Sequence, residues 1–336
     1  MTHIQAPASQ PVKGTLDRLF YNHVTFALLS LLYLTLIVGV PLLVPLLIAR
    51  TLPQGGWSLS AAILLTPLAY ALGYPLLAGL LSRAHRRSVL PGTFPRDVGT
   101  RLYFHRRLYN LCWTTLYYCT PVYHVALSLP VLKRMVFRLF GYRGTPNFTT
   151  YPDTWIRDLP LLRLGDGAYL SNKATVGTNV VLRDGTILVG GVDIGKRALV
   201  GHLSIIAPGT VIGDDVEIGI GVLMGLKVRV EQGAVVSGFC GLGHGVVVGA
   251  RSVIGGGTVV GHATRIGPDL VIPPGMSIPS RVRLTCQEDV AAYCAPYQGP
   301  RERARLVVTP AAVASAERLE FSLAEDPQGV EALVSP

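Results

Sequence analysis

Charge is scarce in this sequence, and acidic side chains are nearly missing from its first half. Only 15% of the 336 residues are charged, and the mean hydropathy is +0.42. Residues 1–150 hold two acidic residues, Asp17 and Asp97, against 14 lysines and arginines, whereas the remainder holds 18 acidic against 16 basic residues. This composition excludes an ordinary soluble surface over the first half. It indicates that the basic residues meet an anionic membrane surface and not nucleic acid.

Cysteine is also sparse, and no cleaved leader is expected at the start of the chain. The five cysteines are far apart and include no C-x-x-C pair, which excludes the usual cysteine metal sites. Residues 1–23 form a polar lead without the basic start, short apolar run and small-residue cleavage site of a signal peptide. These features fit a protein that faces a reducing cytoplasm.

Two long runs without any charge follow the polar lead. The first covers residues 24–49 and the second begins at Trp57 and ends at Ser82. Each run is long enough to cross a bilayer, and the Pro/Gly turn between them predicts a transmembrane hairpin over residues 24–82. Basic residues flank the hairpin at its two ends, so the positive-inside rule places both termini in the cytoplasm. We therefore expect the cytoplasmic (inner) membrane, with the rest of the chain facing the cytoplasm.

Residues 83–150 are predicted to form a basic helical linker at the membrane surface. Leu108–Leu132 is a third run without charge, but arginines and lysines flank it on both sides and Pro121 interrupts it. A spanning helix should have asymmetric flanks, so we expect a broken helix in the interface, with its basic residues on lipid phosphates. A third span is the alternative.

A six-residue repeat runs from Leu164 to about Pro279. An aliphatic residue opens nearly every six and a small residue usually follows, as in Val200-Gly201 and Ile212-Gly213. This period predicts a parallel β-helix over residues 151–280, in which three sixes close one coil. We expect no insertion, so positions three sixes apart should stack at about 4.8 Å. Residues 281–336 are expected to be a cap and tail, partly disordered, with an amphipathic helix over 310–325.

The repeats resemble those of the hexapeptide-repeat acyltransferases, whose β-helix is left-handed. The resemblance is carried by Ile194-Gly195, Val200-Gly201 and the segment 206–214, and residues 138–144 resemble the lead-in of a membrane-attached branch that includes terminal domains of some nonribosomal peptide synthetases. The resemblance implies a left-handed coil and a homotrimer with the active site between adjacent prisms. It also implies acyl-CoA, such as acetyl-CoA, or an acyl-carrier thioester as co-substrate, with no permanently bound cofactor.

Three histidines occupy the third position of their sixes, at outward-facing corners. His244 and His262 are three sixes apart and should stack, and Asp184 precedes His202 by three sixes and should lie beneath it. Acyl transfer from a thioester needs a base near neutral pH, which histidine provides. The segment 242–249 resembles the catalytic segment of UDP-sugar acyltransferases, so His244 is the first candidate base and His262 a possible second member. His202 with Asp184 is the rival pair.

The residues expected to contact the acyl donor are Phe239, Gly243 and Gly261. Phe239 is a large apolar residue close to His244 in sequence, and glycine turns can offer backbone N–H groups. Packing between subunits is the equal alternative for Phe239. No metal is expected, because the β-helix carbonic anhydrases need two closely spaced histidines that this chain lacks. The predicted function is transfer of an acyl group to a hydroxyl or amine of a membrane-associated or small-molecule acceptor. The alternative is a non-catalytic scaffold that docks a partner enzyme at the membrane, in which the histidines are only surface residues.

Overall fold

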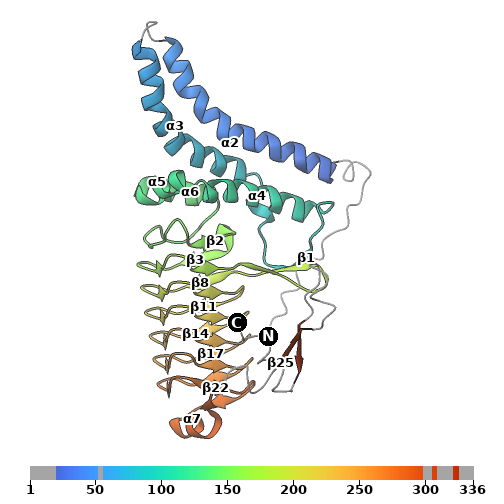
Figure 1. The fold of residues 1–336 in the computed structure, drawn as a ribbon, viewed down its shortest axis with the longest axis vertical. Coiled ribbons are helices and arrows are strands. Elements are labelled where there is room, and N and C mark those ends of the chain that lie inside the picture. The colour runs from blue at the N-terminus through green and yellow to red at the C-terminus, as the bar shows by residue number, and fades with distance from the viewer. Residues whose placement is uncertain (1–19, 52–55, 298–304, 309–320, 325–336) are drawn as a thin grey trace.

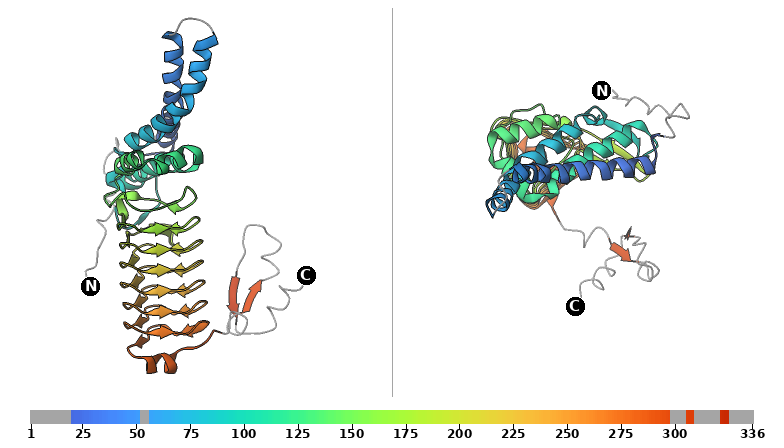
Figure 2. Two further views of the ribbon diagram at one scale, coloured as in Figure 1. Left: turned by 90° about the vertical axis from the view of Figure 1, so that its left-hand side faces the viewer. Right: turned by 90° about the horizontal axis from the view of Figure 1, so that it is seen from above.

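The computed structural model describes residues 20–51, 56–297, 305–308 and 321–324. It shows a helical part stacked on one end of a long β-solenoid (Figures 1 and 2). The apolar first half of the sequence forms the helices, and the six-residue repeats form the solenoid.

The helical part begins with a hairpin of two long helices, α2 (His23–Thr51) and α3 (Gly56–Ser82). Both are long and apolar enough to cross a membrane, and few of their side chains are buried; Leu28 and Leu64, for example, are exposed. Pro41 and Pro45 lie within α2, which bends along its length (Figure 1). Among the described residues no other helix passes the same test of length and apolarity.

Three further helices lie between the hairpin and the solenoid (Figure 1). They are α4 (Arg101–Tyr118), α5 (Thr120–Ser128) and α6 (Pro130–Leu139). Pro121 and Pro130 each occupy the first turn of a new helix, where a missing N–H costs little. The 3₁₀ turn η1 (Arg86–Ser88) and strand β1 (Gly92–Pro95) precede them.

The helices α4 and α6 cover the open end of the solenoid. Trp113 of α4 is fully buried and donates its indole N–H to the carbonyl of Ile156 at 2.7 Å. Phe140, just after α6, packs edge-on against Trp113, with ring centroids 5.1 Å apart. The helical layer is therefore continuous with the core of the solenoid.

The solenoid strands form three sheets, called here faces 1, 2 and 3 in the order in which each full coil visits them, starting from β4. Face 1 contains β4 (Tyr169–Leu170), β9 (Leu199–Val200), β12 (Glu217–Ile218), β15 (Val235–Val236), β18 (Val253–Ile254) and β21 (Val271–Ile272). Face 2 contains β2 (Trp155–Ile156), β5 (Thr175–Val176), β10 (Ile205–Ile206), β13 (Leu223–Met224), β16 (Gly241–Leu242), β19 (Val259–Val260) and β22 (Met276–Ile278). Face 3 contains β3 (Leu162–Leu164), β8 (Val192–Ile194), β11 (Val211–Ile212), β14 (Arg229–Val230), β17 (Val247–Val248), β20 (Arg265–Ile266) and β23 (Arg283–Leu284).

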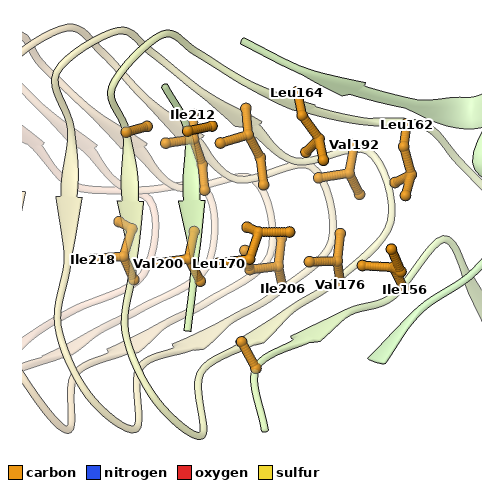
Figure 3. Packing of buried hydrophobic residues seen from close by; sticks show 14 of the residues in the cluster. Ile156, Leu162, Leu164, Leu170, Val176, Val192, Val200, Ile206, Ile212 and Ile218 are labelled. Carbon is orange, nitrogen blue, oxygen red and sulfur yellow. The ribbon is translucent and has the colours of Figure 1, made fainter. Parts of the chain in front are cut away.

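Neighbouring coils are parallel and, from β8 onward, three sixes apart in sequence. Ile206 pairs with Met224, and Ile218 with Val236. The last residue of each strand points inward, and these aliphatic side chains stack in rows along the solenoid (Figure 3). The predicted parallel β-helix is thus confirmed. Its left-handed sense remains a prediction from the resemblance.

The expectation of repeats without an insertion is wrong. Tyr169 pairs with Leu199 and Thr175 with Ile205, so the first full coil is separated from the second by five sixes and not three. The extra residues leave the coil as an antiparallel hairpin of β6 (Asn179–Val181) and β7 (Thr186–Val189). β7 also pairs with β1, which links the hairpin to the helical part. Because the insertion is two sixes long, it leaves the sequence period intact.

The far end of the solenoid extends beyond the predicted boundary at residue 280. β23 adds a strand at 283–284, and α7 (Gln287–Tyr293) covers the end with Val290 buried. β24 (Ala295–Pro296) returns antiparallel to β22. β25 (Arg305–Val308) and β26 (Phe321–Ala324) form an antiparallel pair. β26 contradicts the helix predicted over 310–325, because part of that range is a strand. The rest of the predicted helix and the predicted disorder lie outside the described residues.

Two valines of the solenoid test the stacking of inward side chains. Val248 is fully buried, whereas Val271 opens its strand and is 54% exposed. Val248→Ala should lower the free energy of unfolding by about 2 kcal/mol, because two methyl groups are lost and a cavity remains. Val271→Ala should cost about 0.5 kcal/mol or less. Chemical unfolding of both variants measures the difference, and equal losses would contradict the inward stacking.

A series of tyrosine and histidine side chains joins the α2–α3 hairpin to α4. The Nδ1 atoms of His85 and His105 are 2.9 Å apart, and the Nε2 of His85 is 2.9 Å from the hydroxyl of Tyr33. The hydroxyl of Tyr21 lies 3.5 Å from the Nε2 of His105. Burial lowers the pKa of His85 from 6.5 to about 4, and the nearby His105 makes a smaller contribution in the same direction. Burial and Arg101 lower the pKa of His105.

This junction should weaken in acid. Between pH 6.5 and about 4 the unfolded chain binds a proton at His85 that the folded chain does not, so stability should fall as the pH drops through this window. We expect the melting temperature in detergent to fall between pH 7 and pH 5, and to fall less in His85→Gln. His124→Gln, at an exposed histidine, is the control and should keep the wild-type pH dependence. An unchanged pH dependence in His85→Gln would refute this explanation.

Candidate functional site

His244 and His262 stack at the corner between faces 2 and 3, as their spacing predicts. Their ring centroids are 4.9 Å apart and the ring planes differ by 23°. The backbone N–H of Leu226 donates to Nδ1 of His244 at 2.9 Å, and the N–H of His244 donates to Nδ1 of His262 at 2.8 Å. The N–H of His262 in turn donates to the hydroxyl of Ser280. The two histidines thus belong to a ladder of corner residues one coil apart.

These contacts determine the neutral tautomer of His244 and His262. A backbone N–H can only donate, so each Nδ1 must accept and carries no proton. The proton of the neutral ring is then on Nε2. Both exposed rings therefore present a hydrogen-bond donor to solvent, whereas a general base must present a free lone pair.

His202 has the opposite arrangement, at the corner between faces 1 and 2. Its Nδ1 lies 2.8 Å from the backbone carbonyl oxygen of Asn172 and 3.1 Å from the side-chain oxygen of the same residue. Because a carbonyl can only accept, Nδ1 carries the proton and Nε2 keeps its lone pair. The half-buried His202 is thus the histidine of the three that is arranged as a base.

The prediction that Asp184 lies beneath His202 is wrong. Asp184 lies in the turn of the β6–β7 hairpin, outside the coil, and its carboxylate accepts hydrogen bonds from the N–H and hydroxyl of Thr186 at 2.9 and 2.7 Å. Both hydrogen bonds lower the pKa of Asp184, and the bond from the Thr186 hydroxyl has the larger effect. The insertion places Asn172, five sixes earlier, beneath His202. Asp184 therefore serves the turn and does not orient the ring.

Exposed apolar side chains lie on the same corner as His202. Leu203, Ile220 and Phe239 lie on the same corner between faces 1 and 2, and Phe239 is 68% exposed. A Cβ added to Gly221 would lie 2.8 Å from the Phe239 ring, so the ring covers this glycine. The sequence predicts Phe239 beside His244, but it belongs to the corner of His202. This corner thus combines a histidine with an apolar surface.

Gly243 and Gly261 lie on the other corner, with His244 and His262. Their N–H groups donate to the carbonyls of Val260 and Ile278 at 2.8 Å, so both are used in the ladder between coils. A Cβ at Gly243 would lie 2.8 Å from the backbone nitrogen of His262, and one at Gly261 would lie 2.4 Å from that of Ser280. These glycines permit close packing of coils and offer no free donor to a ligand.

The sequence reasoning missed Asn172, although a signal for it was present. Asn172 has the same third position in its six as His202. The segment Val180–Val189 reads as two apolar strands around Asp184-Gly185, which is a strong hairpin signal. Removing that hairpin from the repeat count would have placed Asn172 next to His202. Among the described residues, no group of three or more histidine, cysteine, aspartate or glutamate side chains is placed to hold a metal ion.

Solved structures similar to this chain are named as acetyl- or acyltransferases. A variant of perosamine N-acetyltransferase from Caulobacter crescentus, in complex with CoA and GDP-perosamine, is 21% identical, with 46% of this chain and 58% of that chain covered and a TM-score of 0.22. UDP-N-acetylglucosamine O-acyltransferase from Moraxella catarrhalis is 14% identical, with 40% and 70% covered and a TM-score of 0.28. The acetyltransferase domain of PglB from Neisseria gonorrhoeae, in complex with acetyl coenzyme A, is 15% identical, with 45% and 63% covered and a TM-score of 0.23.

The matched region is thus less than two thirds of the first and third of these chains. No protein-family model and no curated protein matches the sequence. The fold assignment rests on the strand register, and the chemistry of the site on the contacts of its histidines.

Ring nitrogen chemical shifts test the tautomers directly. At a pH where the histidine rings are neutral, the ¹⁵N spectrum should show His202 protonated at Nδ1. It should show His244 and His262 protonated at Nε2. The variants His202→Gln, His244→Gln and His262→Gln, made one at a time, assign the signals. If the His202 ring carried its proton on Nε2, its lone pair would be on Nδ1, which faces Asn172, and His202 would no longer be the candidate base.

Proposed function

We propose that this protein is a membrane-anchored acyltransferase that uses His202 as its general base. The observation that carries the proposal is the contact between Nδ1 of His202 and the carbonyl of Asn172, which leaves Nε2 free to accept a proton. The same contact orients the ring. The resemblance of the repeats to the hexapeptide acyltransferases supports the reaction type.

The reaction is transfer from a thioester to a hydroxyl or amine. The acceptor attacks the thioester carbonyl carbon while Nε2 of His202 removes its proton. The carbon–sulfur bond then breaks, and the leaving sulfur takes the proton from His202, which yields an ester or amide and a free thiol. Leu203, Ile220 and Phe239 would supply the apolar surface for the acyl donor, an acyl-CoA such as acetyl-CoA or an acyl-carrier thioester.

The position of His202 favours an acceptor at the membrane. Its partner Asn172 lies in the first full coil, next to the helical part, whereas His244 and His262 lie further along the solenoid (Figure 1). The helices α2 and α3 would anchor the protein in the inner membrane with the solenoid in the cytoplasm. An acceptor bound to the membrane would then reach His202 before the other two histidines.

The repeat resemblance further supports a homotrimer, in which adjacent prisms would enclose the corner of His202. The exposed side chain of Phe239 would then lie between subunits, against the donor or against a second copy. His244 and His262, as Nε2–H donors on the other corner, would not serve as the base.

Thiol release tests the proposal. The purified full-length protein in detergent is given acetyl-CoA, longer acyl-CoAs or an acyl-carrier thioester, with a membrane extract as the source of acceptors. His202→Gln should lower thiol release by about 10²–10⁴-fold, because a positioned base contributes that much. The matched variant His244→Gln, at the other corner, should change release by less than about threefold.

Circular dichroism should first show that both variants keep the wild-type fold. Full activity of His202→Gln beside an inactive His244→Gln would reverse the assignment of the base. If the wild-type protein released no thiol from any acyl-CoA or acyl-carrier donor, acyl transfer would be refuted in favour of a scaffold that docks a partner enzyme.

A further inference from the structure

A cavity of about 440 Å³ lies where the α2–α3 hairpin, α4 and the solenoid meet. Phe26 and Ser30 of α2 form one wall, and residues of α4 form another. The β6–β7 hairpin supplies Asn179, Val181 and Ile187. The insertion in the repeats therefore completes this cavity, which is separate from the corner of His202.

The described residues that line the cavity include four arginines and no acidic residue. The arginines are Arg96, Arg106, Arg107 and Arg157. Within the described part of the chain, the only ion pair that any of them makes is that of Arg106 with the buried Asp158, whose side chain does not line the cavity. Arg107 lies over the ring of Phe26 at 4.2 Å, and Arg96 donates to the hydroxyl of Tyr103 at 3.4 Å. The cavity thus concentrates positive charge that its own lining does not neutralise.

Buried donors in this group have no partner among the described residues. Arg106 is 1% exposed, and while its Nη2 binds Asp158, its Nη1 is buried without a hydrogen bond. The Nε of Arg157 is also buried and unpaired. A buried guanidinium donor without a partner is costly, so a bound acceptor would be favourable. Planar guanidinium groups match the oxygens of phosphate in particular.

The wall formed by α2 indicates where such a ligand comes from. Phe26 and Ser30 lie near the start of the first candidate membrane span, whose surface is apolar. A headgroup held by the arginines would leave its hydrocarbon chains beside this helix. The side-chain amides of Asn110 and Asn179 add donors for headgroup oxygens. The hydroxyls of Ser30 and Thr114 already donate to backbone carbonyls of α2 and α4.

We propose that this cavity binds the phosphate-bearing headgroup of a membrane lipid. The arginines bind the phosphate oxygens and α2 lies along the lipid chains. This binding site does not depend on the proposed acyl transfer, because none of its residues belongs to the corner of His202.

Native mass spectrometry of the full-length protein in a neutral detergent tests the site. Dioleoyl phosphatidic acid is the probe, and dioleoylglycerol, with the same chains and no phosphate, is the control lipid. We expect one phosphatidic acid to bind per chain and no dioleoylglycerol. Arg107→Gln and Arg157→Gln should each weaken binding at least about tenfold, because each removes charge-assisted hydrogen bonds. Arg229→Gln, an exposed arginine on face 3, makes the same change in charge and should bind as the wild type.

Inorganic phosphate and pyrophosphate separate a lipid headgroup from a soluble anion. We expect them to compete with phosphatidic acid only weakly. Pyrophosphate that binds as tightly as phosphatidic acid would overturn the assignment to a lipid. Equal binding of phosphatidic acid by the wild type, Arg107→Gln and Arg157→Gln, or no binding by the wild type, would overturn the site itself.

Discussion

The stacking of one inward aliphatic side chain on its equivalent in the next coil is the contact on which the rest of this structure depends. Each strand of a coil is mostly two residues long, too short to be stable alone, so the coils are stabilised by the rows of buried side chains between them. The close approach of backbones at corners such as Gly195 and Gly249 follows from this stacking, because a Cβ there would lie about 2.4 Å from the next coil. The outward side chains are then free to vary, and the candidate chemistry lies among them.

A stack of this kind leaves an apolar core and unpaired backbone groups at both ends. At the far end α7 covers the last coil. At the near end the helices α4 and α6 do so, with Trp113 hydrogen-bonded to the first turn of the solenoid. A helical layer that is basic and apolar in sequence is therefore also part of the solenoid core. The pairing of β1 with β7 is a second link between the helical part and the solenoid. It brings the β6–β7 hairpin beside α2.

The chemical character of each histidine depends on the single group that faces its Nδ1. At His244 and His262 this group is the backbone N–H of the preceding coil, and at His202 it is a carbonyl of Asn172. All three residues have the same position in the repeat, yet two rings present a proton and one presents a lone pair. The insertion decides which residue lies beneath His202. The chain leaves the coil after face 2, so the residue one coil earlier is Asn172 and not Asp184.

The sequence by itself determined the features that depend on a local period. Twenty aliphatic residues at a spacing of six predict the solenoid, and two runs without charge predict the helical hairpin, because each pattern reflects contacts between residues at regular intervals. The stack of His244 on His262 follows from the same arithmetic. Only the tertiary structure decided which residues lie against His202 and which donors are left unpaired in the arginine cavity. An insertion of two whole sixes does not disturb the period, and a cavity formed by α2, α4 and the β6–β7 hairpin brings together residues that no spacing in the sequence relates.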